Sequence, residues 1–233
     1  MTSQSVVAFV GNSSMSRVFI DTATDGQFGG NLLLSQNASQ NLGLEMPNVM
    51  IDFLSMTYTA SLAIWRIIDS VTQRVERWGL CSKVGYVCSD ETKIAPFKVK
   101  PTSLLEVYPM QSAAGANDTA CLGWIRSGDY AEPFTVTTTE DGTLTAVTSV
   151  ITGQSVGDTF FGKTINEIKF QGEDGCTLFS MAFVKADGAT VWQKTGNVRA
   201  PSAGATTTQT NLHCMTNIQV GKGDELKIAV TSA

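Results

Sequence analysis

Residues able to do acid–base or nucleophilic chemistry are sparse in this chain, which has a single histidine, His213. One imidazole excludes a metal site built from several histidines, and it leaves a Ser/His/Asp or Cys/His mechanism with one possible base. No Asp or Glu lies within the ten residues upstream of His213. We therefore interpret His213 as an ordinary strand or loop residue. The sequence predicts no catalytic residue.

The five cysteines lack the spacing of zinc ligands. Cys81 and Cys88 are seven residues apart, and Cys121, Cys176 and Cys214 are isolated, so no C-x-x-C pair occurs. An odd number of cysteines, in a chain whose first residues do not form an export signal, favours reduced thiols packed as small core residues. We expect no metal ligands and no cofactor-binding residues.

Adjacent acidic residues occur at four turn signals: Asp90-Glu91, Glu140-Asp141, Glu173-Asp174 and Asp224-Glu225. Local hydrogen bonding to the backbone explains acidic residues at turns. Two alternatives stay open, since a glycosidase needs two carboxylates facing each other across a cleft and Ca²⁺ prefers clustered loop oxygens. Because nucleotide, P-loop, HExxH and EF-hand patterns are also absent, we expect a protein that is not an enzyme.

The four tryptophans lie inside strand-like segments: Trp65, Trp78, Trp124 and Trp192. Aromatic rings on an exposed sheet face can stack on sugars, whereas rings in a sandwich are more often core residues. We interpret them as core residues and keep a glycan platform as the alternative, with Trp78 and Trp192 as its test positions.

Composition and charge narrow the class of protein further. Charged residues make up 16% of the chain, against about 25% in typical globular proteins. A low charge content fits surfaces that neighbouring subunits cover, and it fits equally well strands in which threonine replaces lysine and glutamate. The net charge is −5 and basic residues are scattered, so we expect no direct binding of nucleic acid. No apolar run is long enough to predict a membrane span.

The pattern of secondary structure is β nearly throughout, with short apolar or alternating runs cut by turn residues. Asp-Gly pairs such as Asp141-Gly142 and Asp187-Gly188 mark tight turns. They predict two hairpins, over residues 134–147 and 177–193. One segment, residues 31–42, could be a short helix or an irregular loop.

The two halves of the chain echo each other. Ile51-Asp52-Phe53 recurs as Ile168-Lys169-Phe170, a spacing of 117 (168 − 51). Segment 61–68 recurs as 177–184, and segment 97–107 recurs as 218–228. The sequence therefore predicts an all-β protein of two tandem β-sandwich, jelly-roll-like domains with similar halves, residues 1–118 and 119–233, with small polar residues from Gln111 onward as the linker.

The tandem halves, the Thr/Ser/Gly/Ala-rich strands and the Ala/Thr-rich loop 200–209 give the chain a resemblance of style to a known class. It resembles viral and phage capsid proteins with jelly-roll or β-sandwich domains, either coat subunits or head decoration (cement) proteins. The resemblance implies a non-enzymatic virion protein, assembled in the host cytoplasm, that forms a homotrimer or higher oligomer and contacts other capsid subunits. The alternative is a carbohydrate- or receptor-binding module of a phage tail or surface fibre.

Overall fold

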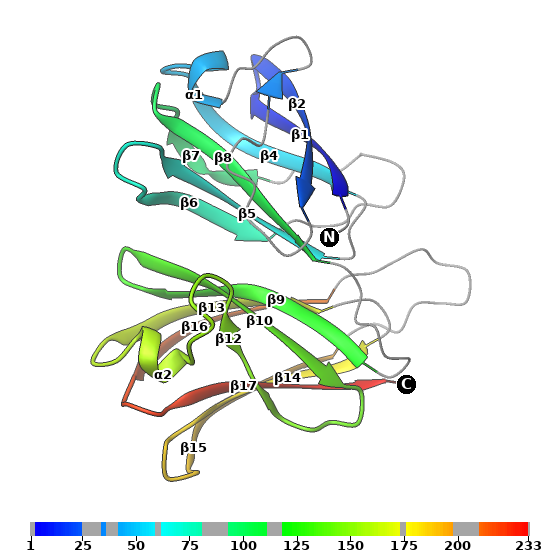
Figure 1. Ribbon diagram of the computed structural model, residues 1–233, viewed down its shortest axis with the longest axis vertical. Helices are drawn as coiled ribbons and strands as arrows, with labels where there is room; N and C mark the ends of the chain where they lie inside the picture. Colours follow the sequence, from blue (N-terminus) through cyan, green and yellow to red (C-terminus); the bar gives the residue numbers. More distant parts are fainter. Residues whose placement is uncertain are drawn as a thin grey trace. The chain divides into compact units, whose positions relative to one another are not determined.

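The computed structural model describes residues 3–24, 34–35, 42–58, 62–80, 93–110, 118–172, 176–197 and 210–232. Antiparallel strands make up most of this part of the chain, so the predicted all-β class is confirmed (Figure 1). The contacts divide the chain into two compact units, Met1–Gln111 and Ser112–Ala233. None of the helices in the described ranges is long and apolar enough to cross a membrane.

Unit 1 is a sandwich of two sheets. The five-stranded sheet has the order β3-β2-β1-β4-β7, and the three-stranded sheet has the order β6-β5-β8. The strands are β1 (Ser3–Asn12), β2 (Met15–Thr24), β3 (Leu34–Ser35), β4 (Met50–Tyr58), β5 (Leu62–Asp69), β6 (Val75–Leu80), β7 (Lys93–Lys98) and β8 (Ser103–Met110). Alternation along β1 turns Val6, Ala8 and Val10 into the core. There they meet residues of the facing sheet, including Trp65 and Leu105.

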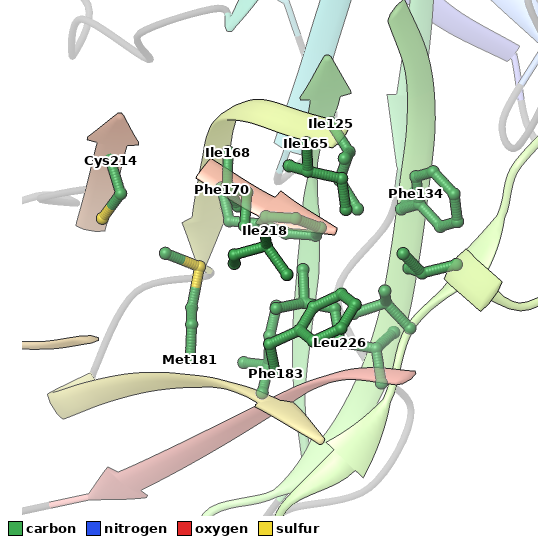
Figure 2. Close-up of a cluster of buried hydrophobic side chains, with 14 of the residues drawn as sticks. Ile125, Phe134, Ile165, Ile168, Phe170, Met181, Phe183, Cys214, Ile218 and Leu226 are labelled. Carbon is green, nitrogen blue, oxygen red and sulfur yellow. The ribbon is translucent and has the colours of Figure 1, made fainter. Parts of the chain in front are cut away.

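Unit 2 has the same two-layer construction. Its sheets have the orders β12-β10-β9-β13-β16 and β11-β17-β14-β15. The strands are β9 (Asp118–Ser127), β10 (Tyr130–Thr139), β11 (Thr145–Ala146), β12 (Thr148–Ser149), β13 (Thr164–Gly172), β14 (Cys176–Val184), β15 (Thr190–Asn197), β16 (Thr210–Gln219) and β17 (Glu225–Ser232). Figure 2 shows the core between them, where Phe134 and Phe170 of one sheet face Phe183 and Leu226 of the other.

The two units repeat one strand order. If β1 is matched with β9, β2 with β10, β3 with β12 and β4 with β13, both five-stranded sheets have the same sequence of neighbours. Matching β5, β6, β7 and β8 with β14, β15, β16 and β17 completes the agreement, and β11 is the extra strand of unit 2. The three sequence echoes fall on matched strands. The strand order differs from that of a jelly roll, in which the first strand pairs with the last.

A short helix repeats with the strands. α1 (Leu42–Glu45) and α2 (Val156–Thr159) begin 114 residues apart (156 − 42). Each starts with a fully buried aliphatic residue followed by a buried glycine, Gly43 or Gly157. Both glycines press on backbone, because a Cβ would lie 2.4 Å from the Pro101 carbonyl oxygen at Gly43 and 2.5 Å from that of Asp224 at Gly157. In both units the helix therefore packs closely against the turn that precedes the last strand.

The turn that follows each helix also repeats. Asn48 and Gly162 both have a positive φ, 65° and 72°. Their N–H groups donate to matched carbonyls, that of Val99 (2.8 Å) and that of Val220 (3.1 Å). A positive φ explains the residue types, since Asn and Gly tolerate this region best.

Of the two hairpins predicted from the sequence, one is wrong and one is confirmed. The predicted hairpin 134–147 is wrong: β10 pairs with β9 and β12, while β11 pairs with β17. The reason is that the N–H of Gly142 donates to Val230 (2.9 Å), which carries the chain across to the other sheet after the Asp-Gly turn. The predicted hairpin 177–193 is confirmed as β14–β15.

In the ambiguous segment 31–42, Leu34–Ser35 forms β3 and Leu42 opens α1, while the remaining positions lie outside the described residues. The contacts divide the chain after Gln111 rather than after residue 118, and β9 belongs to the second unit. That the units are separate domains stays a prediction.

Candidate functional site

The strongest concentration of charged side chains around the single histidine is the Glu167 cluster, formed by Glu167, Lys169, Arg126 and His213. On β13, alternate residues Ile168 and Phe170 enter the core. Glu167 and Lys169 therefore point to the opposite face of the sheet. Strand register places Arg126 of β9 opposite Glu167 and His213 of β16 opposite Lys169.

The carboxylate of Glu167 is the centre of this cluster. Its Oε2 lies 2.7 Å from Nε of Arg126, and its Oε1 lies 3.1 Å from Nζ of Lys169 and 2.9 Å from Nε2 of His213. Burial alone would raise the pKa of Glu167, but the hydrogen bond from Lys169 and the positive charges of Lys169 and Arg126 outweigh burial and hold it below its ordinary value. Glu167 is thus kept as a carboxylate that balances the neighbouring cations.

The structure places His213 on strand β16. His213 does have an acidic partner, supplied by a neighbouring strand rather than by the residues just before it. The imidazole is half exposed. The adjacent thiol cannot act with it, because Cys214 lies in the core on the other face and burial raises its pKa (Figure 2). A thiol held protonated is a poor nucleophile. Glu167 is a poor base for the opposite reason, because neighbouring cations lower its pKa and leave it little affinity for a proton.

In the two acidic pairs that the structure describes, the aspartates Asp141 and Asp224 accept hydrogen bonds within their own turns. Asp224 is 2% exposed and accepts hydrogen bonds from the N–H of Gly221 (2.6 Å) and from Nζ of Lys185 (2.7 Å). Asp141 accepts from the N–H of Thr143 (2.9 Å) and from Oγ1 of Thr139 (2.8 Å). The pairs Asp90-Glu91 and Glu173-Asp174 lie outside the described residues. In the parts of the chain that the structure describes, no group of three His, Cys, Asp or Glu residues could hold a metal ion.

The tryptophans are core or half-buried residues. Trp65 is 4% exposed and Trp124 is fully buried. Trp192 packs partly against the core of unit 2, and Trp78 is half-buried. Cys121 and Cys214 are buried in the core of unit 2, while Cys81 and Cys88 lie outside the described residues. These residues support the fold and do not converge on a common site.

One surface hollow in unit 1 lies beside the β1–β2 turn and is lined by Asn12, Ser13, Ser14, Met15, Ser16, Asp52 and Phe53. The Asn12 side chain is already committed to structure. Its Oδ1 accepts from the N–H groups of Ser14 (2.8 Å) and Met15 (3.0 Å), and its Nδ2 donates to the carbonyl of Met50 (2.6 Å). Among the described residues that line the hollow, Asp52 is the acidic one, and no base accompanies it.

Comparison with known proteins gives no family for this chain: no family model, no curated protein and no solved structure matches it.

Proposed function

We propose that this chain is a non-enzymatic structural component of an icosahedral virus or phage capsid. In this role it makes shell-building or shell-stabilising (cement) contacts with neighbouring subunits, as a homotrimer or higher oligomer. It would be found in the virion after assembly in the host cytoplasm.

The observation that carries the proposal is the repetition of one two-sheet unit, with the same strand order, the same short helix and matched backbone hydrogen bonds. A second two-sheet unit enlarges the surface that is available for contacts with other subunits. The polar clusters fit the same interpretation, since Glu167 forms ion pairs between neighbouring strands and Asp224 accepts hydrogen bonds that hold a turn. The low content of charged residues is consistent with a protein whose surfaces meet other proteins.

The competing function is a carbohydrate- or receptor-binding module. It rests on exposed aromatic residues, of which Phe161 (63% exposed) and Tyr130 (42%) are more accessible than the tryptophans. Glycan recognition needs such rings together with hydrogen-bonding groups on a preformed surface.

Electron microscopy of the purified chain, alone and mixed with shells from its source particle, tests the proposal. We expect ordered oligomers, lattices or decorated shells. Particles of a single chain that neither assemble nor decorate shells, combined with binding on a glycan array, would reject the capsid function and support the competing one.

A further inference from the structure

Unit 1 has a surface hollow beside the β1–β2 turn, lined by residues 12–16 of this turn and by Asp52 and Phe53 of β4. Its volume is about 410 Å³, which lies within the range of about 300–1,000 Å³ that is typical of small-molecule sites. Because the two units repeat one strand order, the matching place in unit 2 shows how the same positions can be used to support the fold.

Strand register identifies the residues of unit 2 that match the hollow. Counted from the two hairpin turns, Gly11 of β1 matches Arg126 of β9. On the neighbouring strand, Gly11 pairs with Phe53. Arg126 pairs with Glu167, so Glu167 stands at the place of Phe53.

Asp52 and Asn166, the residues just before these, match as well. The register shifts at both of them, in the pairing of β4 with β7 and in the pairing of β13 with β16. They are 114 residues apart (166 − 52), the same spacing that separates the starts of α1 and α2. Each therefore occupies a β-bulge, an irregularity that redirects a side chain and is frequent next to functional sites.

In unit 2 these positions hold the structure together. Oδ1 of Asn166 accepts a hydrogen bond from the N–H of Gly128 in the β9–β10 turn (2.8 Å). Nε of Arg126 lies 2.7 Å from Oε2 of Glu167. An ion pair and a turn-holding amide thus occupy the place that corresponds to the hollow.

Unit 1 holds its turn with a different residue, which leaves Asp52 available. The Asn12 side chain accepts hydrogen bonds from two N–H groups of the β1–β2 turn. Gly11 has no side chain, and a Cβ there would collide with the backbone of the hairpin. The place between Ser16 and Phe53, the two residues paired with Gly11, therefore stays open.

The hollow combines one charged group with several neutral polar groups. The Asp52 carboxylate is half-buried, and no group that the structure describes donates a hydrogen bond to it. Beside it lie the exposed residues Ser13, Ser14 and Ser16 and the ring of Phe53, which is 8% exposed. A carboxylate only accepts hydrogen bonds, whereas serine hydroxyls both donate and accept them.

These groups select a class of ligand. An anion would meet the Asp52 carboxylate with no positively charged side chain among the described lining residues. A wholly apolar ligand would remove water from the carboxylate without replacing its hydrogen bonds. A divalent cation such as Ca²⁺ needs several oxygen ligands of high charge, and no group of three acidic, His or Cys residues gathers in the described part of the chain. A sugar fits, since its hydroxyls donate to a carboxylate and exchange hydrogen bonds with serines.

We propose that the unit 1 hollow binds a neutral saccharide. The Asp52 carboxylate accepts hydrogen bonds from two neighbouring sugar hydroxyls, the serine hydroxyls of the turn bind a further one, and a C–H face of the sugar meets the Phe53 ring. The inference goes beyond the proposed capsid function and does not depend on it. It also differs from the exposed rings of unit 2, because the hollow recognises hydroxyl groups through a carboxylate.

Saturation-transfer NMR and isothermal titration with methyl glycosides of common hexoses test the proposal. We expect at least one glycoside to bind the wild type. Asp52→Ala should weaken this binding about tenfold or more, because the sugar hydroxyls lose a charged acceptor. Asp52→Asn keeps an acceptor of the same shape and should weaken binding less. Ser16→Tyr, which places a large side chain in the hollow, should abolish binding.

Glu45→Ala is the matched control, since it also removes a carboxylate from unit 1 but lies on α1, outside the residues that line the hollow. It should leave glycoside binding unchanged. Thermal unfolding of each variant checks that the fold is kept. Asp52→Ala should shift the unfolding midpoint by less than about 2 °C, because no described group bonds to this carboxylate.

The proposal is overturned if no glycoside binds the wild type, if Asp52→Ala binds like wild type, or if Glu45→Ala weakens binding as strongly as Asp52→Ala does. It is also overturned if Asp52→Ala lowers the unfolding midpoint by several degrees, since Asp52 then holds the fold through an ion pair, for which Lys93, opposite Phe53 in β7, is the candidate. Binding of butylamine in place of glycosides would show an ammonium site and would overturn it too. Each of these results leaves the capsid function standing, because assembly is measured separately.

Discussion

Gly157→Ala is the substitution that tests the repeated helix most sharply. Helix propensity predicts that this change stabilises the protein, whereas packing predicts that it destabilises the protein. In an isolated helix, alanine is more favourable than glycine by about 1 kcal/mol. At this position, however, a Cβ would lie 2.5 Å from the carbonyl oxygen of Asp224 and 2.6 Å from its nitrogen. These are backbone atoms that cannot rotate away. Overpacking of this kind costs about 1–3 kcal/mol, so we expect a net loss of stability.

The same change in unit 1 should have the same effect. A Cβ at Gly43 would meet the carbonyl oxygens of Pro101 (2.4 Å) and Lys100 (2.6 Å). With roughly 4 °C per kcal/mol for a unit of this size, each variant should melt about 4–12 °C lower. Gly196→Ala is the control, because its Cβ meets a methyl group of Leu212 at 3.0 Å, and this side chain can move. We expect a change below about 1 kcal/mol there.

Differential scanning calorimetry measures all three variants. The explanation fails if Gly157→Ala is as stable as wild type or more stable, since propensity would then outweigh the contact with the turn. A large loss at Gly43 with none at Gly157 would show that the matched turns are not energetically equivalent.

Three further predictions concern the core and the charged clusters. Phe19→Ala and Phe134→Ala remove fully buried rings at matched positions of β2 and β10, and each should cost about 3–5 kcal/mol in chemical denaturation. Burial tends to raise the pKa of Asp224, but the hydrogen bonds from Lys185, Gly221 and Ala186 lower this pKa overall. The Asp224 carboxylate therefore stabilises the fold above its unfolded pKa of about 4, and this stabilisation is lost as the pH falls through the lower folded pKa. Asp224→Asn should cost about 3 kcal/mol at neutral pH and should flatten the acid limb of a pH–stability curve. His213→Ala should cost less than about 1 kcal/mol in urea unfolding, since the imidazole is half exposed, and a loss of several kcal/mol would contradict its peripheral place in the Glu167 cluster.

The sequence predicted the repeat of strands because alternation and spacing carry that information. Ile51-Asp52-Phe53 and Ile168-Lys169-Phe170 lie on matched strands β4 and β13. In β13, Ile168 and Phe170 both enter the core at a period of two, whereas in β4 the register shifts after Ile51, and Phe53 lines the surface hollow. The hairpin 177–193 was predictable for the same reason, with Asp187-Gly188 at its turn.

Two features of the fold were not predicted correctly, the pairing of residues 134–147 and the repeated helix. Residues 134–147 contain a good turn signal, yet the second arm bonds to β17, some eighty residues later, through Gly142 and Val230 (2.9 Å). The repeated helix was missed because four residues are too short for a helical period. Its available signal was a buried aliphatic residue followed by glycine, 114 residues apart (156 − 42), at Leu42-Gly43 and Val156-Gly157.

The Glu167 cluster was missed for a related reason. His213 and Glu167 come together only through the register of β13 with β16, in which Glu167 is level with Met215 and Lys169 with His213. A sequence search for acidic residues close to the histidine cannot find a partner on a neighbouring strand.

The most direct test of the proposed role is the native mass of the unmodified chain over a concentration series. A protein built to join copies of itself should give a discrete multiple of 24.9 kDa that becomes more populated as the concentration rises. A single 24.9 kDa species at every concentration would contradict the account.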